Sequence, residues 1–241
     1  MILTEEITAF QRDGFLVVRG AAQGTLLQQL DRELDRMRED VENGILRGNH
    51  LMENARKARV IFNPYDHSPA LRELVDRADM VERAKAMLGG PVHIHHTKLM
   101  GKPALEGTNQ PWHQDYYYWQ GNKPNQVAVF VCVDPSTEEN GCLRCIPGSH
   151  RAGLREHHKF IHETTGERHW VCAVSPEELD CQTLFLGQPG DLIFFHSLTV
   201  HGSEGNRSRV PRRAVIYEYD ERGNLAPALG WGAPTPAVEW D

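Results

Sequence analysis

The stretch QTLFLGQPGDLIFFHS at residues 182–197 decides how the second half of the chain folds. It joins two short apolar runs through a turn of Gly, Pro and Asp, a pattern typical of β-strands. Similar runs recur from residue 91 onward: PVHIHHTKLMG (91–101), QVAVFVCVDP (126–135), GCLRCIPGS (141–149) and RRAVIYEYD (212–220). Many short strands with irregular turns predict two antiparallel sheets packed as a jelly roll.

The first 90 residues have a different texture, with apolar residues at helical spacing. We expect helices near residues 3–13, from Gly24 to about residue 46, and from Pro69 to Leu88, with a short strand at FLVVRG (15–20). The predicted fold is mainly β with flanking α: a double-stranded β-helix (jelly-roll, cupin-like) core over 91–220, with the mostly helical N-terminal region, residues 1–90, packed outside it. No linker is visible, so residues 1–241 are expected to form one domain.

Composition excludes several classes of protein. Of 241 residues, 40% are hydrophobic and 24% charged, an ordinary globular mixture. The net charge of -7 and the lack of a Lys/Arg run argue against a nucleic-acid partner. No apolar run reaches the roughly 20 residues that span a bilayer, and no signal peptide is evident, so no membrane partner is expected. Five cysteines, an odd number, argue against a disulfide framework and predict a cytoplasmic protein.

A candidate metal site lies in NQPWHQDYYYW, residues 109–119. Because side chains i and i+2 of an extended chain point to the same side, His113 and Asp115 converge. His196 and His201 both follow the apolar run near residue 195, and either could add a second histidine. Two histidines and one carboxylate leave open positions on iron(II). His157 sits in polar surroundings, which predicts a surface loop.

A cationic side chain follows this constellation. Arg212 lies eleven residues after His201, on the next predicted strand. A guanidinium binds a carboxylate through two parallel hydrogen bonds and keeps its charge when partly buried. It therefore suits the distal carboxylate of 2-oxoglutarate. Arg212 and Arg213 must face opposite sides of their strand, so only one can point inward.

Four motifs in order resemble the phytanoyl-CoA dioxygenase superfamily. They are WHQDY (112–116), NGCLRCIPGSH (140–150), PGDLIFFHSLTVHGS (189–203) and NRSxxPRRA (206–214). The resemblance covers roughly residues 90–219, and FQRDGFLVVRG (10–20) looks like the opening segment of the same family. It implies an Fe(II)- and 2-oxoglutarate-dependent dioxygenase that consumes O2.

The resemblance also assigns roles to single residues. It implies that His113, Asp115 and His201 hold the iron, which demotes His196. Arg212 is expected to bind 2-oxoglutarate with help from Ser203. Where related hydroxylases have a Gln that contacts 2-oxoglutarate, this chain has His96, so His96 and its strand neighbour Lys98 are candidates for the same role.

The substrate is less constrained. The resemblance implies oxidation of an unactivated C–H bond of a small molecule by hydroxylation, ring closure or desaturation, in secondary metabolism or small-molecule tailoring. Tyr116, Tyr117, Trp119 and Arg144 are candidate lining residues of the substrate pocket. The amphipathic helix at 25–41 covers either this chain's own sheet or that of a second copy, so a monomer and a homodimer are both open.

Two other interpretations remain at this point. A cupin-like, zinc-dependent enzyme without dioxygen chemistry would explain the ligands but leave Arg212 without a role. A catalytically silent β-sandwich binding module would make the histidines incidental, and it predicts neither iron uptake nor 2-oxoglutarate turnover.

Overall fold

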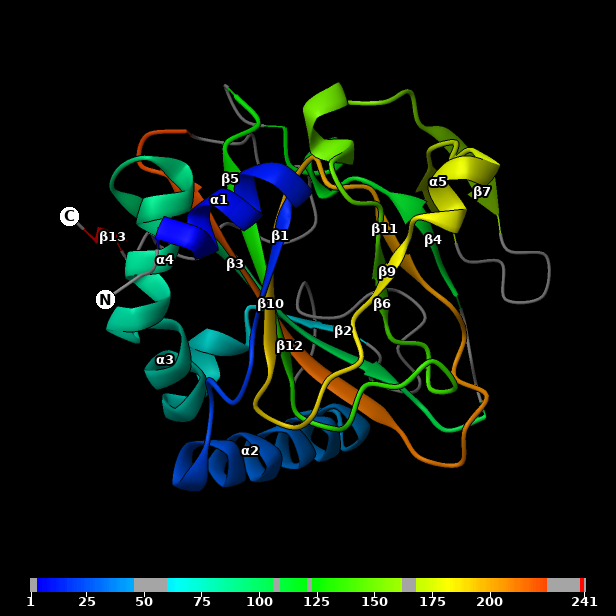
Figure 1. Cartoon of the computed structure of the whole chain (residues 1–241). Helices are drawn as coiled ribbons and strands as arrows, with labels where there is room; N and C mark the ends of the chain where they lie inside the picture. Colours follow the sequence, from blue (N-terminus) through cyan, green and yellow to red (C-terminus); the bar gives the residue numbers. More distant parts are fainter. Residues whose placement is uncertain are drawn as a thin grey trace.

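A computed structural model describes residues 4–45, 60–105, 109–120, 123–161, 168–224 and 239–240. Two antiparallel sheets face each other (Figure 1), as the jelly-roll prediction requires. The larger sheet has the order β1-β10-β5-β12-β3-β13, with β2 paired to β3. Its strands are β1 (Phe15–Val18), β2 (Val60–Phe62), β3 (Val92–Lys102), β5 (Gln126–Cys132), β10 (Leu192–His196), β12 (Arg212–Glu221) and β13 (Glu239–Trp240).

The smaller sheet has the order β4-β11-β6-β9. Its strands are β4 (Gln110–His113), β6 (Leu143–Cys145), β9 (Thr183–Leu184) and β11 (His201–Ser203). A separate hairpin joins β7 (His158–Ile161) to β8 (Arg168–Val171). The smaller sheet is the one that carries His113 and His201.

Alternation along the strands of the larger sheet separates two cores. On β5, Val129 and the residues two positions before and after it pack toward the helices. Ala128 and Phe130, between them, point toward the smaller sheet. Leu143 and Cys145 of the smaller sheet join this second cluster, so it fills the interior between the sheets. A residue's place in the strand therefore decides whether it lies in the interior or under the helices.

Helices cover the outer face of the larger sheet (Figure 1). Leu30, Leu34 and Met37 of α2 are buried within this chain, so the amphipathic helix covers its own domain. No helix among the described segments is both long and apolar enough to cross a bilayer. The α-helices are α1 (Thr4–Asp13), α2 (Gly24–Glu42), α3 (Pro69–Val75), α4 (Ala78–Leu88) and α5 (Pro176–Asp180), and the 3-10 helices are η2 (Pro64–His67), η3 (Asp115–Tyr117) and η4 (Ser149–Ala152).

The prediction of one helix from Pro69 to Leu88 is wrong, because the chain breaks between α3 and α4. Arg77 has an extended ψ of 124°, and its guanidinium donates to Ala21 O at 2.5 Å. Asp76 ends α3, and Tyr65 Oη donates to its carboxylate at 3.3 Å. These tertiary contacts outweigh the continuous apolar pattern.

A β-bulge interrupts β3 at His95. Opposite this point on β12, Glu218 pairs with His96 while Tyr219 pairs with Ile94, so His95 has no partner in the register. A bulge re-aims the side chains around it. His95 and His96 consequently lie together, with their Nδ1 atoms 2.7 Å apart.

Candidate active site

Two paired strands and the turn after them bring three potential metal ligands together. His113 ends β4 and pairs directly with His201 of β11. Asp115 begins η3, two residues beyond His113. All three side chains are buried, with relative exposures of 5–6%.

Distances within the group suit one metal ion. His113 Nε2 lies 3.6 Å from Asp115 Oδ1, and His201 Nε2 lies 3.7 Å from Asp115 Oδ2. One potential ligand atom from each residue falls within 4.8 Å of the other two. Donors that share a metal at about 2.1 Å are roughly 3 to 4 Å apart. The arrangement is a two-histidine, one-carboxylate facial set.

Backbone carbonyls fix the orientation of both imidazoles. His113 Nδ1 donates to Pro111 O at 2.8 Å, and His201 Nδ1 donates to Thr199 O at 2.9 Å. A carbonyl can only accept, so Nδ1 carries the proton and Nε2 keeps its lone pair. Both Nε2 atoms are thus prepared to bind a cation between them and Asp115.

The local electrostatics favour the protonation states that bind metal. Burial, and next the neighbouring His113, lower the pKa of His201 to about 4, so its imidazole is neutral at pH 7. Burial alone would raise the pKa of Asp115, but His201, Lys98 and His113 together hold it below its usual value. A neutral imidazole and an ionised carboxylate are the ligand forms.

His196, the other candidate left open by the sequence, lies elsewhere. It pairs with Val127, whose side chain packs among the helices. Its ring contacts those of Phe10 and His150, with centroids 6.3 and 5.5 Å away. Of the two histidines, His201 alone lies beside His113 and Asp115.

Arg212 points into the interior between the sheets. It shares the face of β12 that carries Ala214 and Ile216, and it is 2% exposed. Its Nε and Nη1 have no hydrogen-bond partner among the described residues, and its Cζ lies 5.2 Å from the centroid of the Phe130 ring. Burial lowers the pKa of Arg212 to about 10, so the side chain stays charged at pH 7. A buried cation with free donors is prepared for an anion.

Two further residues lie toward the Arg212 end of the interior. Ser203 follows His201 by two residues on β11, so both side chains face the same side. Lys102 pairs with Arg212 across β3 and β12, and its Nζ donates to Glu204 O. Burial, and next the charge of Arg212, lower the pKa of Lys102 to about 7.

His96 and Lys98 lie farther along the same two strands. His96 pairs with Glu218, six residues beyond the pair of Lys102 with Arg212, which is about 20 Å at the usual rise of a strand. Trp119 covers both: its ring centroid lies 4.5 Å from that of His96 and 5.7 Å from Lys98 Nζ. The interior thus has an Arg212 end and a Trp119 end.

The aromatic residues after Asp115 differ in their surroundings. Tyr117 stacks on His157 with ring centroids 4.3 Å apart, and Trp170 lies 5.3 Å away. His157 is buried and its Nε2 accepts from Gln114 N at 3.1 Å, so the surface-loop prediction for this histidine is wrong. Tyr116 is half-buried, and its backbone N–H donates to Ser197 O at 3.0 Å.

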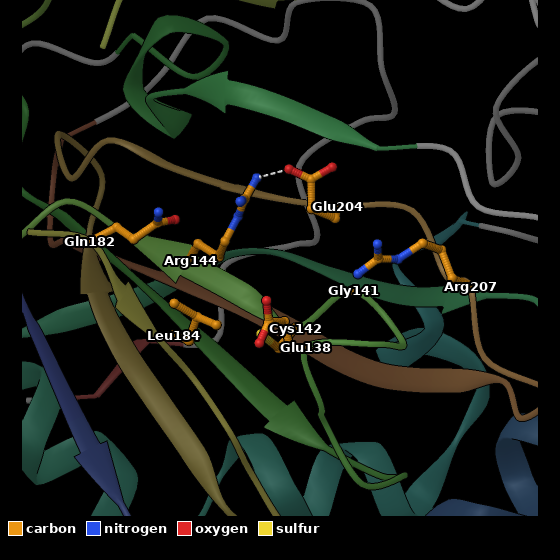
Figure 2. Close-up of a pocket in the computed structure, with 8 residues that line it drawn as sticks. All are labelled: Glu138, Gly141, Cys142, Arg144, Gln182, Leu184, Glu204 and Arg207. Atoms are coloured by element: carbon orange, nitrogen blue, oxygen red, sulfur yellow. Dashed lines mark hydrogen bonds and ion pairs between the residues drawn. The ribbon is translucent and has the colours of Figure 1, made fainter. Parts of the chain in front are cut away.

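Arg144 lies apart from the other candidates. It pairs with Gly202 on β11, whereas Cys145 pairs with His201, so Arg144 faces the opposite side of the smaller sheet. There its guanidinium is ion-paired to Glu204 and lies 4.9 Å from the Trp112 ring. Figure 2 shows this outer pocket, which Leu184 also lines.

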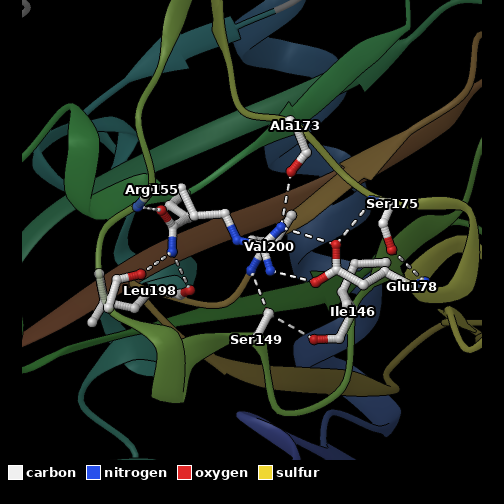
Figure 3. A network of polar contacts seen from close by, with 10 residues as sticks. Ile146, Ser149, Arg155, Ala173, Ser175, Glu178, Leu198 and Val200 are labelled. Carbon is white, nitrogen blue, oxygen red and sulfur yellow. Dashed lines mark hydrogen bonds and ion pairs between the residues drawn. The ribbon is translucent and has the colours of Figure 1, made fainter.

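Gln114, between the two first ligands, was missed from the sequence. It is fully buried, and its Nε2 donates to Leu198 O at 2.7 Å and to Gly153 O at 2.9 Å. Its Oε1 accepts from Arg155 N at 2.7 Å, and the Arg155 guanidinium is in turn ion-paired to Glu178 (Figure 3). Gln114 therefore anchors the segment that carries His113 and Asp115 to two loops, one with Gly153 and Arg155 and the other with Leu198.

Glu218 was also missed. It is 1% exposed, faces His96, and neither carboxylate oxygen has a hydrogen-bond partner in the described residues. The sequence signal was present: on β3, the residues packed under the helices switch from Val92 and Ile94 to Leu99, that is, from even to odd numbers. Such a switch indicates a bulge, and the bulge sets the register of Glu218.

Comparisons with known proteins identify the family of this chain. The family model for phytanoyl-CoA dioxygenase (PhyH) matches residues 10–214. The probable alpha-ketoglutarate-dependent hypophosphite dioxygenase of Stutzerimonas stutzeri is 28% identical over 185 residues, which cover 75% of this chain and 63% of that protein. The L-proline trans-4-hydroxylase of Streptomyces griseoviridis is 28% identical over 218 residues, which cover 80% of each protein.

A solved structure extends the likeness to the whole fold. EctD from S. alaskensis, crystallised with 2-oxoglutarate and 5-hydroxyectoine, is 25% identical, with a TM-score of 0.77 over 98% of this chain and 82% of that one. The jelly-roll prediction is therefore confirmed both by the sheets themselves and by this neighbour.

Proposed function

This chain belongs to the phytanoyl-CoA dioxygenase family, and from that premise we propose that it is an iron(II)- and 2-oxoglutarate-dependent dioxygenase. It oxidises an unactivated C–H bond of a small molecule, by hydroxylation or by ring closure or desaturation. When bound, iron(II) would supply the oxidative chemistry, with 2-oxoglutarate and O2 as the cosubstrates. Everything else in the reaction depends on how this chain binds and orients its ligands.

His113, Asp115 and His201 hold the iron in this proposal. The support is their common burial, the spacing of their ligand atoms and the carbonyl contacts that direct both Nε2 atoms inward. Two imidazoles and one carboxylate are a donor set that would suit iron(II). A burial of this depth also keeps bulk water from the reacting groups.

Arg212 binds the distal carboxylate of 2-oxoglutarate, with Ser203 beside it. The observation that carries the proposal is the buried guanidinium whose Nε and Nη1 have no partner among the described residues. A bidentate carboxylate would satisfy both donors and compensate the buried charge. A zinc enzyme or a silent binding module would leave this costly arrangement without a purpose.

His96 and Lys98 serve the other end of the interior. His96 lies six residues from the Arg212 pair along the strands, about 20 Å, too far to reach the same carboxylate of a five-carbon acid, whereas Lys98 lies four residues away, about 13 Å. They are placed to contact the end of 2-oxoglutarate next to the metal, or the primary substrate. Trp119 borders the same region, and Tyr116 and Tyr117 belong to the same segment after Asp115, so we assign all three to the substrate side.

The relatives support a small polar substrate in biosynthetic tailoring, since their names concern ectoine, proline and hypophosphite. Four of the five free cysteines are buried, which supports a reducing, cytoplasmic location. The buried stripe of α2 supports a monomer over a homodimer built on that helix. The acidic net charge supports neither nucleic acid nor a membrane surface as partner.

Succinate formation tests the proposal. Protein purified without oxygen receives iron(II), 2-oxoglutarate and then air, and His201→Ala and Arg212→Ala are assayed in parallel. We expect slow succinate release by the wild-type protein and loss of it in both variants. No succinate and no 2-oxoglutarate binding by the iron-loaded wild-type protein would instead support the zinc enzyme or the binding module.

A further inference from the structure

Glu218 stands out among the buried acids because its hydrogen-bonding capacity is unused within the described residues, although the charge of Lys98 acts on it. The side chain is 1% exposed, and both carboxylate oxygens have no hydrogen-bond partner there. The nearest basic atom is His96 Nδ1, 3.5 Å from Oε2, and burial keeps the pKa of His96 well below its usual value. A buried carboxyl in this condition is costly unless a ligand completes it.

The strand register directs Glu218 into the interior between the sheets. On β12 it pairs with His96 on one side and with Ala128 on the other. Ala128 belongs to the interior cluster between the sheets. Its side chain is a single methyl group, which is smaller than that of any other residue except glycine. The Glu218 side chain therefore points into the interior at its Trp119 end, far from Arg212.

The charge of the proposed metal ligand Asp115 also acts on Glu218. Burial, and next the charge of Asp115, raise the pKa of Glu218 well above its usual value, although the charge of Lys98 lowers it. Two carboxyl groups that repel each other gain most from a cation placed between or beside them. The Trp119 ring covers His96, and Lys98 Nζ lies 5.7 Å from its centroid, so this ring already takes part in a contact with a cation.

A second metal ion is the obvious rival occupant, because His95, His96 and Glu218 also cluster within 4.8 Å. The geometry argues against it. The Nδ1 atoms of His95 and His96 lie 2.7 Å apart, a hydrogen-bond distance, whereas two nitrogens bound to one tetrahedral metal are roughly 3.4 Å apart. With one nitrogen donating to the other, these histidines form a fixed wall beside Glu218.

We propose that Glu218 is a specificity-determining residue that binds a protonated amine of the primary substrate, with the unpartnered His96 Nε2 and the Trp119 ring beside it. The ammonium group would donate to the two free carboxylate oxygens and so hold the adjoining carbons toward the metal. The substrate is then a small amine or amino acid. This inference rests on the proposed function, because it places the ammonium beside a reacting centre.

Calorimetric titrations of matched compounds test the proposal. Each pair consists of a small protonated amine and the same molecule with a methylene in place of nitrogen, for example L-proline and cyclopentanecarboxylate. The protein is loaded with iron(II) and 2-oxoglutarate without oxygen. We expect amines to bind more tightly than their partners, and Glu218→Gln to reduce this preference by roughly tenfold or more, the strength of a charged hydrogen bond.

Glu221→Gln is the matched control, since that acid lies at the end of the same strand and is paired to Lys123 outside the interior. It should keep the wild-type preference for amines. The proposal is overturned if no pair shows a preference in the wild-type protein, or if Glu218→Gln preserves it. A second equivalent of iron or zinc per chain that Glu218→Gln removes would overturn it in favour of a metal.

Two further readouts separate this inference from the proposed function. The visible absorption band of the complex of iron(II) with 2-oxoglutarate should form in the wild-type protein and in both variants. Its absence from all three would contradict the proposed function. The same amine titrations on metal-free protein would still reveal whether Glu218 selects amines.

Discussion

Arg212 and Arg213 are neighbours on β12 with opposite surroundings. The Arg213 guanidinium donates to the carboxylates of Asp31, Asp35 and Asp134 at 2.6 to 3.0 Å. Arg212, turned to the interior by the alternation of the strand, meets no carboxylate in the described segments of the chain. One arginine is saturated by this protein's own acids, and the other is left for a ligand.

This contrast predicts opposite effects of the same substitution. Arg212→Lys should raise the KM for 2-oxoglutarate by roughly tenfold or more, because an ammonium cannot make two parallel hydrogen bonds to one carboxylate. Arg213→Lys should leave that KM near its wild-type value and lower the thermal midpoint of unfolding. Steady-state succinate assays and thermal unfolding measure the two effects. Equal KM values in the two variants would contradict the assignment.

Gln114→Met should destabilise the protein by about 2–4 kcal/mol, since it removes the partners of two backbone carbonyls and one N–H. The measurement is chemical denaturation of metal-free protein. Gln120→Met is the control, because Gln120 is exposed and its side chain makes a single 3.3 Å hydrogen bond within the described part of the chain. A loss below about 0.5 kcal/mol for Gln114→Met, within the usual scatter of surface substitutions, would argue against its anchoring role.

Gly190→Ala should be strongly destabilising. Gly190 has a φ of +87°, and an added Cβ would lie 1.9 Å from Ala22 O in the segment between β1 and α2. Gly89 at the end of α4 has a similar φ of +83° but open space around it, so Gly89→Ala should cost only about 1 kcal/mol. Denaturation midpoints compare them. Similar losses would show that the backbone conformation, rather than the contact, limits position 190.

Asp220 predicts a dependence of stability on pH. Burial raises its pKa to about 7, even though Gln126 and Asn224 donate to it. A carboxyl with a raised pKa in the folded state binds its proton more tightly there, so its contribution to stability falls as pH rises from about 4 to 7. Asp220→Asn should flatten this slope.

The free energy of unfolding, measured at pH 5 and pH 8 by urea denaturation, checks this expectation. Asp180→Asn, at an exposed position, should retain the wild-type slope. An unchanged slope in Asp220→Asn would mean that other buried groups set the pH dependence.

The sequence predicted the strands and the ligand set better than it predicted tertiary detail. Turn residues and apolar runs located β3, β5, β6, β10 and β12, and His113, Asp115, His201 and Arg212 lie in the interior as expected. Their roles in catalysis stay predictions until tested. The same holds for the single domain over residues 1–241.

What the sequence missed depended on contacts between distant segments. The break at Asp76 and Arg77 follows from Tyr65 and Ala21, which periodicity within the helix cannot reveal. Gln114 looked like a spacer in H-x-D because its partners lie near residues 153 and 198. Glu218 looked like the polar half of an alternating strand, since its register depends on the bulge opposite.

The bulge at His95 constrains which changes in length this chain can accept. A deletion of His95 would put the two halves of β3 back in step, so Val92 and Ile94 would exchange sides with His93. The side chains of Val92 and Ile94 would then point into the interior between the sheets. The His93 imidazole would lie under the helices. The substrate range should therefore change through substitutions that keep the length of β3 constant. Insertions or deletions at residues 94–96 should prevent folding.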